Sequence, residues 1–453
     1  MSANNDSSSL TPMRRQYLRI KQGFPDTILL FRLGDFYETF DDDAHIASQE
    51  LEITLTSRSM GKNLRVPMAG IPVHSLENYL ARLIRRGHKV AICEQLSDSA
   101  SSNGLVDRDV VRVVTPGTVT EAALLEQNSN NYLAAVVEEN GLAGLAYVDI
   151  STGEFAATQM LSDGLMMELE RIGAAEALIP AEEEARLWSS NSQGPLGCLL
   201  TQVESAAFDL ESCIRDLREL YGILTLESLG CHELPLAVRA AGAILHYLSQ
   251  TQKRTEHPLG RLTVYSTQSF MTLDVQTRRN LELFQGGRWG SGQLSLLGVL
   301  DQTKTSMGGR LLRRWLGQPL LEIEPLEQRL DAVEYFFQDS LRRANISALL
   351  RKVPDLERIM SRVQAGNVLP RDMVSMAQGL EAVAELSQLL FDIPALSNGD
   401  ASSDFGEKDS QDSSVSHQSR IDWLQKQLTP MPDVAALIHS AIVLDPQGSV
   451  GAG

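Results

Sequence analysis

The sequence has few cysteines and no long apolar run, and both absences exclude classes of protein. Its four cysteines stand far apart without a CxxC pair, at Cys93, Cys198, Cys213 and Cys231. Neither a zinc site nor a disulfide framework is therefore expected, and we predict small buried thiols in a reducing cytoplasm. No stretch of about 18 apolar residues occurs, and the first ten residues lack the basic-then-apolar pattern of a signal peptide. We expect neither a membrane segment nor a metal site.

A positive net charge is also missing. The formal charge of −18 over 453 residues argues at first sight against nucleic acid. Its distribution changes this interpretation, because residues 1–115 hold 14 basic and 14 acidic side chains and the remainder carries the whole −18. If the protein touches a polyanion, the neutral N-terminal part is the expected surface.

Residues of contrasting character succeed one another along the chain, and its length suggests about three domains. Residues 1–10 are polar and expected to be disordered. Residues 11–116 predict an α/β domain, residues 125–260 predict a second, and 265–453 is mostly helical. Inside the helical part, residues 397–420 hold eight serines and five acids with almost no apolar residue, which predicts a disordered insert.

Local signals set the elements expected in the first domain. Thr11 before Pro12 is typical of a helix start, and Gly34-Asp35 is expected to be a turn between two strands. The strands expected are 28–33, 36–40, 52–57, 90–93 and 110–114, and a turn is expected at PMAGIP, residues 67–72.

The sharpest local feature is the pair Phe36 and Glu38. Side chains two apart on a strand point the same way, so a ring and a carboxylate share a face. Such a ring can stack on a base where a mispair lowers the cost of opening the duplex. Beside phosphates the charged carboxyl is disfavoured, and its neutral form can donate a hydrogen bond to a base. The alternative is a core phenylalanine beside a solvated or ion-paired glutamate, and the strand pattern alone favours it.

Several motifs, taken in order, resemble the bacterial MutS family. They are Thr11-Pro12-Met13, GDFYE at 34–38, PMAGIP at 67–72, AICEQ at 91–95, VVTPGT at 113–118, Asp274, TRRNLE at 277–282, and the stretch from Met307-Gly308 to Trp315-Leu316. The resemblance spans nearly the whole chain and fails only in the tails and the acidic insert, which makes it specific. It implies a multidomain protein with an α/β mismatch-recognition domain, an α/β RNase H-like connector and an incomplete helical lever domain.

The resemblance implies a DNA site in the first domain. Phe36 matches the family's minor-groove wedge, and Glu38 matches its hydrogen-bond partner to the mispaired base. Members of the family are ATPases that use ATP and Mg, but this sequence has no GxxxxGK[ST] phosphate-binding loop. We therefore expect neither a catalytic residue nor a cofactor in this chain.

Four basic residues and one methionine complete the expected DNA site. Arg58 and Arg108 match positions that contact the DNA backbone, whereas Lys62 and Arg65 are added on charge alone. Each of the four is otherwise an ordinary solvated surface charge. Met68 is expected either to pack against the widened groove or to support the loop from inside.

The expected ligand is duplex DNA with mispairs or small loops, and the expected partner is a downstream MutL-type repair factor. The resemblance places the protein in the cytoplasm, associated with the nucleoid. The sequence ends before the family's clamp, ATPase and dimerising segments, so a homodimer is expected only for a full-length protein.

Two other functions stay open. The chain can be an interaction scaffold whose acidic parts dock a repair factor. It can also be an RNase H-like nuclease, because Asp149 ends a predicted strand and such enzymes hold metals with strand carboxylates. Against this, Asp149 can simply begin a turn with Ser151 and Gly153, and no second carboxylate is placed beside it.

Overall fold

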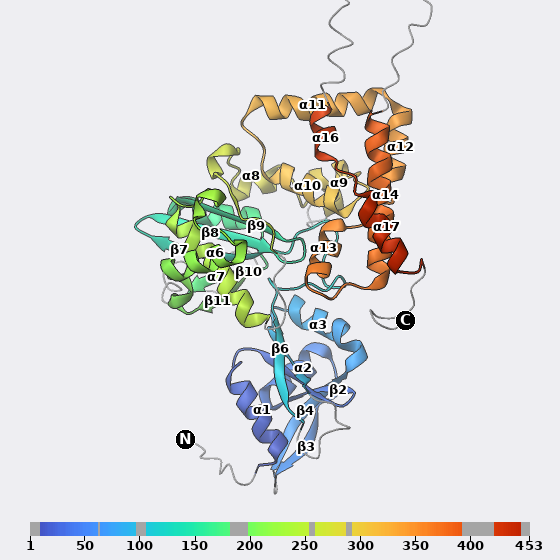
Figure 1. Ribbon diagram of the computed structural model, residues 1–453. Coiled ribbons are helices and arrows are strands. Elements are labelled where there is room, and N and C mark those ends of the chain that lie inside the picture. The colour runs from blue at the N-terminus through green and yellow to red at the C-terminus, as the bar shows by residue number, and fades with distance from the viewer. Residues whose placement is uncertain are drawn as a thin grey trace, which may run out of the picture. The chain divides into compact units, whose positions relative to one another are not determined.

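The computed structural model describes residues 10–61, 64–96, 106–181, 198–252, 259–286, 292–391 and 421–444. They form two compact units (Figure 1). Residues up to 126 and from 130 to 265 belong to unit 1, and residues 127–129 and those from 266 onward belong to unit 2. The predicted disorder of the N-terminal tail and of the insert 397–420, and the predicted DNA contact of Lys62, lie outside the described residues. Within the described ranges no helix is long and apolar enough to cross a membrane.

Unit 1 begins with a mixed six-stranded sheet in the order β3-β4-β2-β1-β5-β6. β1 and β5 run parallel, and the other neighbouring strands are antiparallel. The elements are α1 (Pro12–Gln22), β1 (Ile28–Leu33), β2 (Phe36–Phe40), α2 (Asp41–Leu51), β3 (Thr56–Gly61), β4 (Leu64–Pro72), η1 (Val73–Ser75), α3 (Leu76–Arg85), β5 (Val90–Gln95) and β6 (Arg108–Val114).

Helices cover both faces of this first sheet (Figure 1). α1 packs Tyr17 on the face that holds Phe31 and Phe40, and α2 and α3 cover the opposite face, which holds Tyr37. Because successive side chains of a strand alternate between faces, Phe36 and Glu38 belong to the α1 face.

Two predicted boundaries are confirmed. The Thr11 hydroxyl caps α1 by accepting a 3.3 Å hydrogen bond from the Arg14 amide. Gly34 has a φ of +61° in the two-residue turn that joins β1 to β2. Glycine adopts this conformation at little cost, so the chain reverses tightly and Phe36 stands at the very start of β2.

Two predicted elements are wrong. The strand expected at 52–57 is β3 at Thr56–Gly61, because α2 continues to Leu51 and Glu52 caps it in a left-handed conformation. The turn expected at 67–72 is part of β4, which pairs with both β2 and β3. Its prolines and glycine suggested a turn, but Ala69 and Ile71 are buried in strand alternation.

A second six-stranded sheet follows in unit 1, in the order β11-β10-β7-β8-β9-β12. β8 is antiparallel to both of its neighbours, β7 and β9, whereas β10, β11 and β12 each pair in parallel. α6 and α7 pack on one face and α4 on the other. The elements are β7 (Leu133–Glu139), β8 (Leu142–Asp149), β9 (Glu154–Leu161), η2 (Ser162–Gly164), α4 (Leu165–Ile172), β10 (Glu176–Pro180), β11 (Leu199–Val203), η3 (Ser205–Phe208), α6 (Leu210–Tyr221), η4 (Leu226–Leu229), α7 (Pro235–Thr251) and β12 (Thr263–Val264).

The two sheets meet at a buried carboxylate, Glu176. It accepts hydrogen bonds from the Thr115 hydroxyl, from the Gly117 amide at 3.1 Å, and from Tyr247 at 2.8 Å. A Cβ at position 117 would lie 2.9 Å from the Glu176 Cβ, so only glycine allows the turn after β6 to approach so closely. Burial, and then the charge of Glu176, raises the pKa of Tyr247 well above its usual value.

Unit 2 is helical in its described part, as the sequence predicted. Its elements are η5 (Thr267–Ser269), α8 (Val275–Asn280), η6 (Gly292–Leu294), α9 (Leu296–Leu300), α10 (Ser306–Gly317), α11 (Ile323–Gln338), α12 (Ser340–Leu350), α13 (Leu356–Gln364), α14 (Pro370–Phe391), α16 (Asp422–Gln427) and α17 (Pro432–Ala441). The linker 127–129 belongs to this unit because Arg310 donates to the Gln127 carbonyl and Arg358 to the Ser129 carbonyl, each at 2.9 Å.

The cysteines are free thiols, as expected. Cys93, Cys213 and Cys231 are buried and Cys198 is half-buried. Burial raises the pKa of each thiol, to about 12 for Cys93, Cys198 and Cys213. These thiols are therefore protonated at neutral pH, which suits packing rather than reactivity.

Candidate nucleic-acid interface

The first sheet exposes an aromatic ring at the start of β2. Phe36 is 48% exposed, although its neighbour Tyr37 is buried on the other face of the sheet. Leu33 and Pro72 are its partners on β1 and β4. The alternative of a core phenylalanine is therefore excluded, and the ring is accessible to a ligand.

Glu38 lies two residues further along the same face and is paired with Arg58. The Arg58 guanidinium on β3 donates to the Glu38 carboxylate. Glu38 stands opposite Gly70 on β4, the strand between β2 and β3. Because Gly70 has no side chain, nothing on the central strand separates the two charged groups. The interpretation of Glu38 as ion-paired thus holds in the unbound protein.

The opposite face of β2 is braced by Glu94, a residue for which no role was predicted. Its carboxylate accepts from the Tyr37 hydroxyl and from Arg32 at 2.7 Å. Burial, and then the hydrogen bond to Glu94, raises the pKa of Tyr37, and that of Arg32 is raised mainly by the same carboxylate. Glu94 belongs to the AICEQ motif at 91–95, and this was the signal in the sequence from which its role could have been predicted. These contacts fix the strand that carries Phe36.

Met68 and Arg65 lie on β4 next to this site. Met68 is half-buried, pairs with Phe40 and Thr56, and packs against the cluster beneath α1. It therefore packs against the sheet rather than supporting a loop, and a contact of Met68 with the DNA groove stays a prediction. Arg65 is exposed and pairs with Ser59, so strand alternation directs it away from the face of Arg58 and Glu38.

Arg108 is only 8% exposed, unlike the solvated cation that was the alternative for it. Its guanidinium donates to the Arg32 carbonyl at 2.8 Å and to the Val106 carbonyl at 2.9 Å, and it lies over the Phe31 ring. Burial lowers the pKa of Arg108. A phosphate contact by Arg108 stays a prediction.

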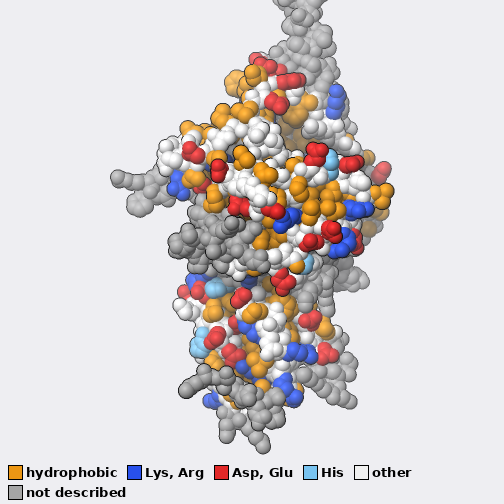
Figure 2. All heavy atoms as spheres, turned by 90° about the vertical axis from the view of Figure 1, so that its left-hand side faces the viewer, with side chains coloured by type: hydrophobic (Ala, Val, Ile, Leu, Met, Phe, Trp, Pro, Cys, Tyr) orange, Lys and Arg blue, Asp and Glu red, His pale blue; other side chains and the backbone are white. Residues whose placement is uncertain are grey.

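The surface charge is mixed rather than uniformly basic. On the face drawn in Figure 2, Lys and Arg side chains are interspersed with Asp and Glu. The ion pairs of the first domain include Arg14 with Asp41, Arg32 with Glu94 and Arg58 with Glu38. Since many cations are already paired with acids, attraction of DNA by bulk charge alone would be weak.

The second sheet supplies the second carboxylate that the nuclease interpretation lacked. Asp149 at the end of β8 pairs with Glu154 at the start of β9. Both carboxylates accept from the Asn130 amide, at 2.8 and 3.3 Å, and Asp149 also accepts from the Ser151 amide and hydroxyl. The described residues contain no group of three or more His, Cys, Asp or Glu side chains able to hold a metal ion. The two bonds from Ser151 show that Asp149 organises the turn after β8.

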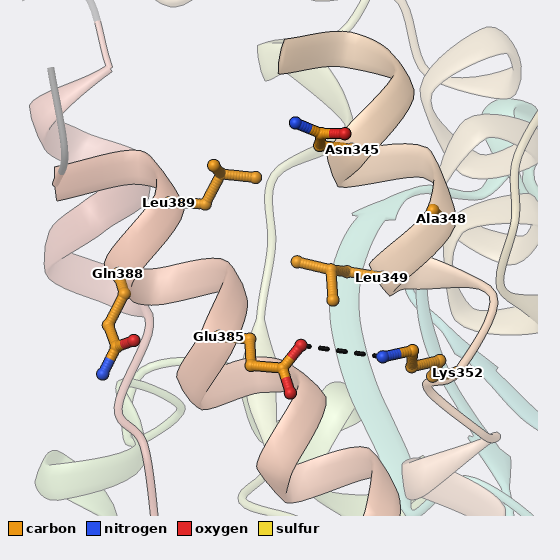
Figure 3. Close-up of a pocket in the computed structure, with 7 residues that line it drawn as sticks. All are labelled: Asn345, Ala348, Leu349, Lys352, Glu385, Gln388 and Leu389. Atoms are coloured by element: carbon orange, nitrogen blue, oxygen red, sulfur yellow. Dashed lines mark ion pairs between the residues drawn. The ribbon is translucent and has the colours of Figure 1, made fainter. Parts of the chain in front are cut away.

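Unit 2 contains a hollow between α12 and α14 (Figure 3). Leu349 and Leu389 line it together with the ion pair of Lys352 and Glu385, whose atoms are 3.6 Å apart. The lining is mixed and open, and both charged side chains are more than half exposed. It offers no convergent set of polar groups of the kind that orients a ligand.

Three domain profiles match the chain in order. MutS domain I matches residues 11–123, MutS domain II residues 131–262, and MutS domain III residues 276–453. Proteins named DNA mismatch repair protein MutS are similar to the chain. Those of Dehalococcoides mccartyi and Symbiobacterium thermophilum are each 43% identical, over 98% and 97% of this chain and 49% and 48% of their own length. The chain spans about half the length of the curated relatives it matches.

Proposed function

The chain belongs to the MutS family, and from this premise we propose that its first α/β domain recognises mispaired or unpaired bases in duplex DNA. The profile of domain I covers the sheet that carries Phe36 and Glu38. The single observation that carries the proposal is the exposed Phe36 ring, held at the start of a strand whose other face is braced by Glu94.

Phe36 is proposed to act as a wedge in the minor groove. An inserted apolar ring opens a base step at a cost of a few kcal/mol, and this cost is smallest where pairing is already defective. Stacking of the ring on a base returns about 1–3 kcal/mol. The difference between mispaired and paired steps therefore becomes a difference in affinity.

Glu38 is proposed to hydrogen bond to the edge of the displaced base, because it shares the face of Phe36 two residues along β2. Arg58 is the described cation on this face that is proposed to contact a phosphate. Arg65, on the other face of the same hairpin, and the buried Arg108 are proposed as further contacts. Phosphate contacts position the protein, whereas the contacts of Phe36 and Glu38 discriminate.

The remaining domains are proposed to serve as connector and lever. An antiparallel three-strand meander continued by parallel strands is compatible with an RNase H-like connector. A MutL-type partner and a homodimer are proposed for the longer relatives. We further propose that these 453 residues bind no nucleotide, because the sequence has no phosphate-binding loop.

The proposal is tested by competition binding of the chain to a G·T duplex and to the matched duplex at stated salt. We expect the wild type to prefer the mispair and Phe36→Ala to lose that preference without a change in melting temperature. A 2-aminopurine beside the mispair should brighten when the wild type binds, because its base is unstacked, and should stay dark with Phe36→Ala.

Leu161→Ala is the matched control, because Leu161 is also an exposed apolar residue but lies in the second sheet. It should leave the preference intact. Equal binding of both duplexes by the wild type, or a preserved preference in Phe36→Ala, would contradict the proposed function.

A further inference from the structure

We propose that Arg58 and a mispaired base compete for Glu38. On matched DNA the ion pair between Arg58 and Glu38 stays formed. At a mispair the base takes the place of Arg58 on Glu38, and the Arg58 guanidinium can then bind a phosphate. The inference rests on the proposed function and assigns Arg58 a role in specificity beyond that of a backbone contact.

In the ion pair of Glu38 and Arg58 the two side chains differ in exposure. The Glu38 side chain is 14% exposed and that of Arg58 is 40% exposed. The carboxylate is thus largely covered, and the guanidinium covering it reaches solvent. A partner approaching this face meets Arg58 and Phe36 before it meets Glu38.

The Glu38–Arg58 pair differs in its support from the Lys21–Asp43 pair of the same domain. Asp43, for comparison, is paired with Lys21 and also accepts from the buried Leu29 amide at 3.0 Å. Glu38 has Arg58 as the partner that the structure records for its carboxylate. An ion pair held by one half-exposed contact contributes little stability, so exchanging it costs little.

On matched DNA the exchange has no favourable outcome. The carboxylate would leave Arg58 and face phosphates without a base edge to bind, and like charges repel. The pair therefore stays closed and presents no net charge to the duplex. This neutral contact lets the protein sit on matched DNA while it searches.

At a mispair both partners gain new contacts. The Glu38 carboxyl forms a hydrogen bond with the edge of the base displaced by Phe36. Arg58 then becomes available to a phosphate oxygen, which a guanidinium can bind as it binds a carboxylate. Recognition of a base would then add one phosphate contact that matched DNA does not receive. Since each neutralised phosphate steepens the dependence of log K on log salt by about 0.9, the two duplexes should differ in slope.

The experiment measures binding of G·T and matched duplexes by the chain between about 50 and 200 mM salt. For the wild type we expect the mispaired slope to exceed the matched slope by about 0.9. Arg58→Gln should make the slopes equal at the shallower value. Glu38→Gln should make them equal at the steeper value, because Arg58 is then available on either duplex.

Two further variants separate this role from a general loss of charge. Arg65→Gln removes an exposed cation from the same hairpin and should lower both slopes equally, so that the difference persists. Arg58→Lys keeps a charge and should restore part of the difference. Melting temperatures of all variants verify that the chain is folded.

The outcomes distinguish the two proposals. A wild type without mispair preference overturns the proposed function. A wild type that prefers the mispair but shows equal slopes, or an Arg58→Gln chain that keeps the slope difference, overturns the competition between Arg58 and the base while leaving the wedge intact.

Discussion

The two six-stranded sheets of unit 1 use their carboxylates in opposite ways. In the second sheet Glu176 is fully buried and accepts hydrogen bonds from Thr115, Gly117 and Tyr247. In the first sheet Glu38 is covered by Arg58 alone among the contacts recorded for it, beside the half-exposed ring of Phe36. Both sheets have helices on two faces, so the difference lies in the sites and not in the architecture.

This difference teaches how a structural carboxylate differs from one available to a ligand. A buried acid with several donors is costly to disturb, because each donor left behind loses its partner in a dry interior. An acid with one half-exposed partner can change partners at little cost. Burial and the number of donors therefore separate Glu176 and Asp149 from Glu38, although all three lie on strands.

The largest effect is expected at the junction of the sheets. Glu176→Ala removes the acceptor of Thr201, at 2.6 Å, and of Tyr247, and leaves Lys89 without its nearest carboxylate. Breaking a buried charged network of this kind costs about 3–5 kcal/mol. Denaturant unfolding should show this loss in the free energy of unfolding of unit 1.

Glu233→Ala is the control for that change, because the Glu233 side chain is 85% exposed and lies in the same domain. It should shift the unfolding midpoint by no more than a typical surface substitution, within about 0.5 kcal/mol. If Glu176→Ala destabilised the protein no more than the control, Glu176 would not be a structural carboxylate and would not differ from Glu38 in this respect.

The next effect compares two phenylalanines on one face of the first sheet. Phe31 is completely buried, whereas Phe36 is exposed. Phe31→Ala should cost about 3–5 kcal/mol of unfolding free energy, and Phe36→Ala less than about 1 kcal/mol. Thermal and denaturant unfolding of the two variants measure the difference, and equal losses would show that the exposed ring of Phe36 stabilises the fold as much as the buried ring of Phe31 does.

The sequence predicted the face of Phe36 but could not predict its exposure. Strand alternation alone places Phe36 with Glu38. Whether the ring is covered depends on which other elements pack on this face, and that information is absent from the strand pattern. The ion pair of Glu38 with Arg58 depends on the strand order β3-β4-β2. This order could not be predicted, because PMAGIP resembles a turn and β4 was therefore not expected.

Two other residues were missed for different reasons. Glu154 could have been found, because the hairpin register directly pairs it with Asp149 across the Ser151-Thr152 turn. Glu176 could not, because its hydrogen-bond partners lie 25 to 71 residues away along the chain. A family motif can mark such a position without its partner, as VVTPGT at 113–118 marks the turn at 115–117.

A smaller effect is expected for Glu38→Gln. The neutral amide can still hydrogen bond to a base, it repels phosphates less, and it releases Arg58 from its ion pair. Matched and mispaired duplexes should both bind more tightly, by a few-fold, and their ratio should shrink. Weaker binding to both duplexes in the competition assay would instead indicate that Glu38 is a purely structural ion-pair partner.

The smallest effect on DNA is expected at the carboxylates of the second sheet. A two-metal nuclease needs carboxylates that are open to the ions, with metals about 3.5–4 Å apart. Asp149 is fully buried, and its oxygens accept from Ser151, Asn130 and the Asn131 amide. Glu154 accepts from Tyr132 at 2.9 Å, and burial raises the pKa of that tyrosine, which keeps it a donor.

Asp149→Asn should therefore leave the affinity for matched and mispaired duplexes unchanged within about twofold, the size of effect expected away from a binding surface. We expect no magnesium-dependent cleavage of either duplex by the wild type or by the variant. The comparison uses gel analysis of labelled duplexes with and without Mg, after circular dichroism has verified that the variant is folded. Cleavage that requires Mg and disappears in Asp149→Asn would mean that these hydrogen bonds yield to a metal, and the second sheet would then hold a site of its own.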